Sequence, residues 1–194
     1  MWEELEELAA ETETVAAWDR QVTALLDISN GPVPDVPASL QASLRPYQLE
    51  GFQWLSFLWE HELGGILADD MGLGKTVQSI ALFAYARELF DAESRALTER
   101  SFVTQSDVVA PGFAPFLVVA PTSVVPNWER EINKFAPHLK VATITASQKK
   151  AKQPLAEQIR DADVVITSYT LFRLDEEAYM EAVSYTHLTL PTSD

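Results

Sequence analysis

Apolar side chains in the first quarter of the chain recur at three- and four-residue steps. Between residues 2 and 28 this pattern predicts one or two amphipathic helices that serve as a packing or capping element. The proline-rich stretch SNGPVPDVPAS then ends the helical pattern, and residues 46–61 predict a further, strongly aromatic helix with a proline in its first turn. We therefore expect a helical segment at 1–30, a linker at 31–43 and a domain at 44–182.

Short β-branched runs alternate with helical patterns through the rest of the chain. The runs predict strands at 64–69, 116–121, 141–145 and 163–168. The helical patterns lie at 75–91, 127–136, 154–160 and 171–182. This alternation, with nearly continuous apolar strands, predicts an α/β fold with a mainly parallel sheet flanked by helices on both faces. The polar stretch 91–112 is expected to be a surface insertion.

The last residues do not continue this alternation. VSYTHLTLPT, at 183–192, could form a strand by its polar and apolar alternation, yet it also resembles a translated sequencing adapter. We expect 183–194 to be a non-native tail and the natural sequence to be cut near Ala182.

Composition and charge limit the classes of function. The chain is 47% hydrophobic and has no cysteine, which excludes disulfides and thiolate metal sites. No apolar run reaches the roughly 20 residues of a membrane span, so we expect a cytoplasmic protein with no membrane partner. The net charge of −15 divides into −8 for residues 1–35 and −7 for the remainder, so no part forms a basic clamp for nucleic acid.

The stretch GGILADDMGLGKTVQSIAL, at 64–82, predicts a phosphate-binding loop between a strand and a helix. Gly72 and Gly74 allow backbone N–H groups to approach phosphates, Lys75 supplies a cation, and the Thr76 hydroxyl is placed to bind Mg²⁺. Asp69 stands where the usual pattern has glycine. The alternative is an ordinary strand–turn–helix junction that contains Gly-Leu-Gly-Lys-Thr by chance.

Four ordered motifs carry a more specific resemblance. LRPYQLEGFQWL (44–55), LADDMGLGKT (67–76), LVVAPTSVVPNWEREINKFAP (117–137) and VVITSYTLFR (164–173) resemble the first motifs of the Swi/Snf family of DNA-translocating ATPases, in particular its bacterial members. The resemblance implies the first RecA-like lobe of an ATP-dependent translocase on double-stranded DNA. It also implies ATP and Mg²⁺ as cofactors and a DNA-bound protein complex as the remodelled partner. In a bacterium, such a protein would be associated with the nucleoid.

The resemblance assigns roles to individual residues. Lys75 and Thr76 would be catalytic, Thr76 through the nucleotide's Mg²⁺, and Gln48 would read the adenine edge. The implied nucleotide contacts are Arg45, Tyr47, Gln48, Asp69, Asp70, Met71, Gly72, Leu73, Gly74, Lys75 and Thr76. The implied DNA phosphate contacts are Pro121, Thr122, Ser123, Asn127, Thr167, Ser168 and Tyr169. Without the resemblance, both sets of DNA contacts are merely turns between strands and helices.

Two motif-like stretches are rejected. LDEEAY, at 174–179, contains the Asp-Glu pair of the family's metal-binding motif but has helical character, and HELGG, at 61–65, lacks the second histidine of a zinc-protease motif.

The family's own Asp-Glu motif is expected after residue 182. We therefore expect the polypeptide as written to be a fragment with negligible ATPase activity. The alternatives are a phosphate-loop kinase or signalling ATPase that does not act on DNA, and a short protein that binds nucleotide without catalysis.

Overall fold

The computed structural model describes residues 33–104, 112–151 and 153–183, so the predicted N-terminal helices and the tail from 184 onward lie outside the described residues. The elements, in chain order, are α2 (Pro46–Glu60), α3 (Lys75–Thr104), β1 (Phe116–Ala120), α4 (Val125–Phe135), β2 (Val141–Thr143), α5 (Leu155–Ile159), β3 (Val164–Ser168), α6 (Tyr169–Leu174) and α7 (Glu176–Val183).

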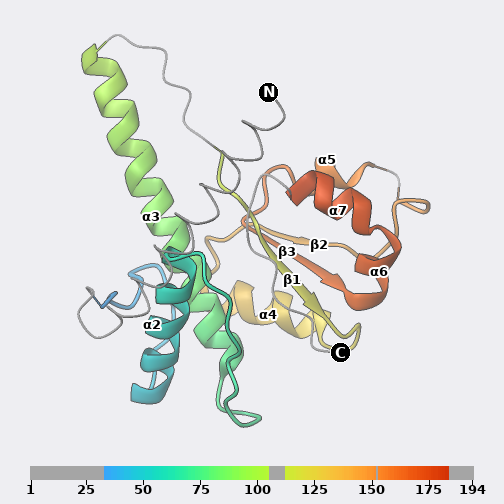
Figure 1. The fold of residues 1–194 in the computed structure, drawn as a ribbon, viewed down its shortest axis with the longest axis horizontal. Helices are drawn as coiled ribbons and strands as arrows, with labels where there is room; N and C mark the ends of the chain where they lie inside the picture. Colours follow the sequence, from blue (N-terminus) through green and yellow to red (C-terminus); the bar gives the residue numbers. More distant parts are fainter. Residues whose placement is uncertain (1–32, 105–111, 152, 184–194) are drawn as a thin grey trace, which may run out of the picture.

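The three strands form a parallel sheet in the order β1-β3-β2. Residues on β3 alternate between its two faces. Val164 and Ile166 belong to a core shared with α3 and α4, whereas Val165 belongs to a second core with Leu155 of α5 and Tyr179 of α7. Figure 1 shows α4 below the sheet and α5 and α7 above it. The prediction of an α/β fold with a parallel sheet covered on both faces is confirmed.

The predicted strand at 64–69 is wrong. These residues lie outside any strand, and Ile66 is 78% exposed. A strand requires a hydrogen-bonded neighbour, and within the described sheet β1 pairs only with β3. Gly64 and Gly65 also disfavour an isolated strand because glycine loses most backbone entropy on ordering.

Helix α3 is longer than predicted, and the last helical stretch is divided. Residues 92–104 continue α3 because they contain good helix formers and neither glycine nor proline, so the described first part of the predicted insertion at 91–112 is helical. Figure 1 shows these last turns extending away from the sheet. The predicted helix at 171–182 is two helices that meet at Asp175, whose carboxylate accepts the Gln148 N–H at 2.8 Å.

The described part of the linker, residues 33–43, packs against the domain. Leu40 is buried in the core shared with α3 and α4. The Ser39 N–H donates to the Glu88 carboxylate at 2.7 Å, and the Gln41 N–H donates to the Phe135 carbonyl at 2.6 Å. The segment is therefore held by α3 and α4 directly before α2 begins.

Candidate nucleotide-binding site

The loop before α3 has the backbone that a phosphate site requires. Gly72 and Gly74 both have φ of +85°, the left-handed region that other residues adopt at a cost. A Cβ on Gly74 would lie 2.4 Å from Gln48 Nε2, so a side chain there is excluded by space as well. The loop leads directly into Lys75, the first residue of α3, where unpaired N–H groups and the positive end of the helix dipole favour an anion.

The Lys75 ammonium lies within this loop. Its Nζ donates to the carbonyl oxygens of Asp69 and Asp70, the second at 3.0 Å. Carbonyl oxygens are neutral acceptors, so these bonds orient the ammonium without cancelling its charge. The charge remains available to a phosphate. Thr76 follows in the first turn of α3, where its hydroxyl could bind the Mg²⁺ of a nucleotide.

Helix α2 contacts the loop through Gln48. Its Nε2 donates to the Leu73 carbonyl and its Oε1 accepts the Arg45 N–H, both at 3.0 Å. The structure therefore brings together Gln48 and the phosphate loop, which are 25 residues apart in the chain. Arg45 and Tyr47 lie exposed at the same end of α2.

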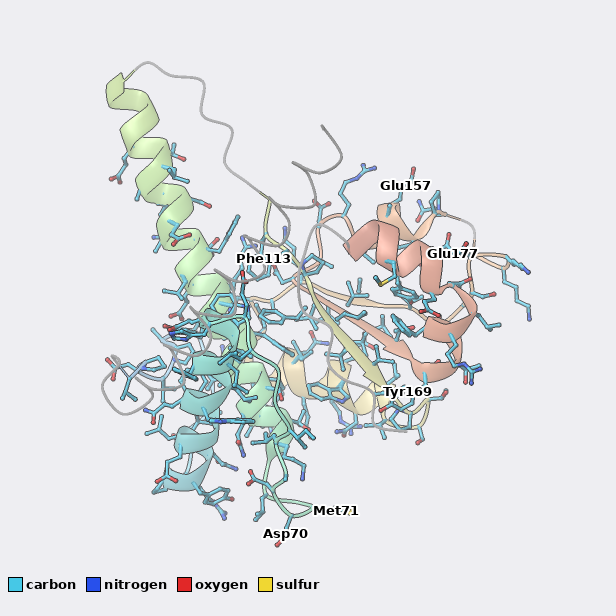
Figure 2. All side chains as sticks on the ribbon, in the orientation of Figure 1. Asp70, Met71, Phe113, Glu157, Tyr169 and Glu177 are labelled. Carbon is cyan, nitrogen blue, oxygen red and sulfur yellow. The ribbon has the colours of Figure 1, made fainter. Side chains whose placement is uncertain are left out.

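The remaining loop residues face outward. Met71 is 97% exposed, and Figure 2 shows Asp70 and Met71 at the outer tip of the loop. Leu73 is 37% exposed. These positions offer backbone groups to a ligand rather than a side-chain pocket.

The two turns expected to contact DNA lie side by side. β1 and β3 are paired in parallel with Ala120 opposite Ser168, so the turns that follow them leave the same edge of the sheet. Pro121, Thr122 and Ser123 are all exposed, and Asn127 follows in α4 with its side chain hydrogen-bonded to Glu131.

The side chains of two expected DNA contacts, Thr167 and Ser168, are buried. The Thr167 side chain is fully buried and its hydroxyl accepts the Tyr179 O–H at 2.9 Å. Burial raises the pKa of Tyr179. Ser168 is 4% exposed, and its Oγ accepts the Leu171 N–H as the N-cap of α6. Neither side chain is available to DNA, because Tyr179 of α7 covers Thr167 and Ser168 caps the N-terminus of α6.

Tyr169 is the exposed member of that turn, at 47%, and Figure 2 shows it at the start of α6. The Asp175 carboxylate, from the rejected LDEEAY stretch, is bound to the Gln148 N–H, which is a structural role. Among the residues that the structure describes, no group of three or more His, Asp or Glu side chains could hold a metal ion. Within the same ranges, no helix is both long and apolar enough to cross a membrane.

One residue of the site was missed from the sequence. Gln78, in the first turns of α3, is fully buried, and its Nε2 donates to the Asp69 carboxylate at 3.2 Å. Its Oε1 faces Gly51 of α2 at a point where a Cβ would be only 1.9 Å away. The sequence did contain a pattern that could have indicated Gln78. It is a glutamine among the apolar residues of VQSIALF, at a position where the helical period predicts a buried side chain.

A comparison with protein families decides the assignment. The family described as SNF2-related domain matches residues 47–189. The chain belongs to this family. The predicted Swi/Snf resemblance is thereby confirmed, and a kinase or signalling ATPase is not supported.

Individual relatives agree with the family. The chain is 40% identical over 158 residues to the "Putative ATP-dependent helicase/translocase YwqA" of Bacillus subtilis, covering 81% of this chain and 15% of that protein. It is 35% identical over 169 residues to the "TATA-binding protein-associated factor MOT1" of Saccharomyces cerevisiae, covering 84% of this chain and 8% of the relative. The chain thus spans a small part of the curated relatives it matches.

A solved structure supports the fold. The "Sulfolobus solfataricus SWI2/SNF2 ATPase core in complex with dsDNA" superposes with a TM-score of 0.55 at 35% identity, covering 76% of this chain and 25% of that one. The described sheet and its helices are therefore part of a SWI2/SNF2 ATPase core of RecA-like type.

Proposed function

We propose that this chain is the nucleotide-binding part of an ATP-dependent translocase that moves along double-stranded DNA. The observation that carries the proposal is the contact between Gln48 and the phosphate loop, because it places an amide able to read adenine beside a loop able to hold phosphates. Family membership and the DNA-bound structural relative support it.

The residues present fit a nucleotide with Mg²⁺. The glycine backbone at 72–74 leaves room for phosphate oxygens, Lys75 supplies the positive charge, and Thr76 would hold the metal ion. The bound ATP supplies a phosphoanhydride bond whose hydrolysis releases free energy. This chain's own residues orient the phosphates and neutralise their charge.

The DNA contact is proposed at the paired turns after β1 and β3. Thr122, Ser123 and the exposed Tyr169 would contact phosphates there without reading base sequence, which suits a motor that must bind every step alike. The net charge of −15 means that these contacts are local and oppose long-range repulsion. The remodelled partner would be a protein complex bound to the same DNA.

Nucleotide binding is tested by isothermal titration of ATP with Mg²⁺ into the wild-type chain, Lys75→Ala and the matched control Lys150→Ala. Lys150 is an exposed lysine outside the loop. We expect at least a tenfold weaker affinity for Lys75→Ala, because a charge-assisted contact to phosphate contributes roughly 1.5–3 kcal/mol. Equal affinities for all three would reject the site.

DNA binding is tested with the whole gene product, because the chain covers only part of its relatives. The affinity for duplex DNA should fall as salt rises, with no preference for sequence. Lack of any salt-dependent affinity would instead favour a nucleotide-binding protein that does not act on DNA.

A further inference from the structure

We propose that Gln78 is a positioning residue that allows the phosphate loop to carry an aspartate at its first position. The proposal rests on the proposed nucleotide function and concerns how the loop keeps its cation available. Asp69 stands where the usual phosphate loop has glycine. A negatively charged carboxylate at that position disfavours the binding of an anion in the loop.

The Asp69 carboxylate could weaken phosphate binding in two ways. The carbonyl oxygen of Asp69 accepts a hydrogen bond from Lys75 Nζ, so Asp69 and the Lys75 ammonium are neighbours in the loop. A carboxylate paired with Lys75 would neutralise the charge that phosphate needs, and an unpaired carboxylate beside phosphate would repel it. Either arrangement would weaken nucleotide binding.

The structure shows the carboxylate held elsewhere. Asp69 Oδ2 accepts a hydrogen bond from Gln78 Nε2 at 3.2 Å, and Lys75 is left to two neutral carbonyls. Gln78 is fully buried, so this amide has little freedom to release the carboxylate. The Gln78 amide is a neutral donor, so it holds the carboxylate without adding a charge of its own to the loop.

Gly51 of α2 fixes the position of the amide. Gln78 Oε1 lies against Gly51 without a hydrogen-bond partner among the described residues, and a Cβ at Gly51 would be 1.9 Å from it. A buried, unpartnered amide oxygen is costly, which indicates that the side chain is placed for its donor. Helix α2 therefore contacts the loop at two points: Gln48 at Leu73 and Gly51 through Gln78.

The test compares ATP affinity, by isothermal titration with Mg²⁺, for the wild-type chain, Gln78→Met, Asp69→Asn and the double variant. Methionine keeps the length and helix propensity of glutamine but donates no hydrogen bond. We expect Gln78→Met to bind ATP roughly tenfold more weakly, the size of one charge-assisted hydrogen bond. We expect Asp69→Asn to bind within about twofold of wild type. The double variant should bind as Asp69→Asn does, because the harmful charge is gone.

A merely structural role of Gln78 would not be rescued in this way. If the loss in Gln78→Met persists unchanged in the Asp69→Asn background, or if Gln78→Met binds as wild type does, the proposal is overturned. Gly51→Ala provides a second route: its Cβ must displace the Gln78 amide, so it should weaken ATP binding and be rescued by Asp69→Asn. This variant keeps the test decisive if Gln78→Met unfolds.

Two further variants separate this inference from the nucleotide function itself. Lys75→Ala must weaken ATP binding if the site is real, whatever Gln78 does. Gln53→Met, which removes a glutamine donor that binds the Pro34 carbonyl elsewhere on α2, should leave the affinity unchanged. Failure of wild type to bind ATP would reject the nucleotide site and this inference together. A normal Lys75→Ala effect without the predicted rescue would reject this inference alone.

Discussion

The Asp163 carboxylate joins three parts of the fold, so its removal should cost far more stability than that of an ordinary surface acid. Its Oδ1 pairs with Arg87 of α3 at 2.8 Å, and its Oδ2 accepts the Lys140 N–H just before β2, also at 2.8 Å. The Asp163 side chain is 6% exposed. Asp163→Ala therefore leaves the Lys140 N–H without its acceptor and Arg87 with one partner fewer.

The magnitude can be estimated from these two contacts. A hydrogen bond that involves a charged group contributes about 1.5–3 kcal/mol. Arg87 keeps its ion pair with Asp91 and its stacking on the Phe90 and Phe113 rings, which offsets part of the loss. We expect Asp163→Ala to lower the free energy of unfolding by about 3 kcal/mol, at the lower end of what breaking a buried ion pair costs.

The assay is equilibrium unfolding in urea at neutral pH, with Asp91→Ala as the matched control. Asp91 contacts the same arginine but its side chain is 42% exposed, so its loss should cost less than about 1 kcal/mol. The dependence on urea concentration should be the same in all three proteins. Equal losses for the two variants, or a loss below about 1 kcal/mol for Asp163→Ala, would refute the reasoning.

Three other outcomes follow from single contacts. Tyr179→Phe should cost about 1 kcal/mol in urea unfolding, because it removes the buried hydrogen bond to Thr167, whereas an unchanged midpoint would contradict this role. Burial, followed by the hydrogen bond and charge of Glu60, raises the pKa of Tyr85 from 10.0 to about 12. The contribution of Tyr85 to the free energy of unfolding is therefore complete below pH 10 and falls as the pH rises toward 12. Tyr85→Phe should flatten the fall of the free energy of unfolding over that pH range. Parallel curves of unfolding free energy against pH for the two proteins would contradict this contribution. Gly74→Ala should abolish ATP binding detected by titration while the chain stays folded by circular dichroism, since the backbone has φ of +85° and Gln48 fills the space; binding equal to wild type would show that the loop tolerates a side chain.

Local patterns were sufficient to predict much of the fold. The β-branched runs at 116–121 and 163–168 are paired parallel strands, and the glycines expected in a phosphate-binding turn, at 72 and 74, both have a positive φ. These features are determined by residues that are close together in the chain, so they can be predicted from a single sequence. The four ordered motifs indicated the family for the same reason.

Features that depend on distant contacts could not be predicted in this way. The run at 64–69 has strand composition, but strand formation requires a hydrogen-bonded neighbour. Thr167 lies near the end of the predicted strand at 163–168, where a hydroxyl was expected to reach DNA, and only the position of Tyr179 in α7 shows that it is buried. Gln78 is an ordinary helical residue until Gly51 and Asp69 are placed around it.

Helix α3 has a mechanical consequence that follows from its length. It begins at Lys75 in the phosphate loop and runs unbroken for 30 residues, or about 45 Å at 1.5 Å per residue. A tilt of about 5° at its first turn would therefore move its far end by about 4 Å. A spectroscopic label at the exposed Glu99 would report small rotations of the loop as displacements large enough to measure.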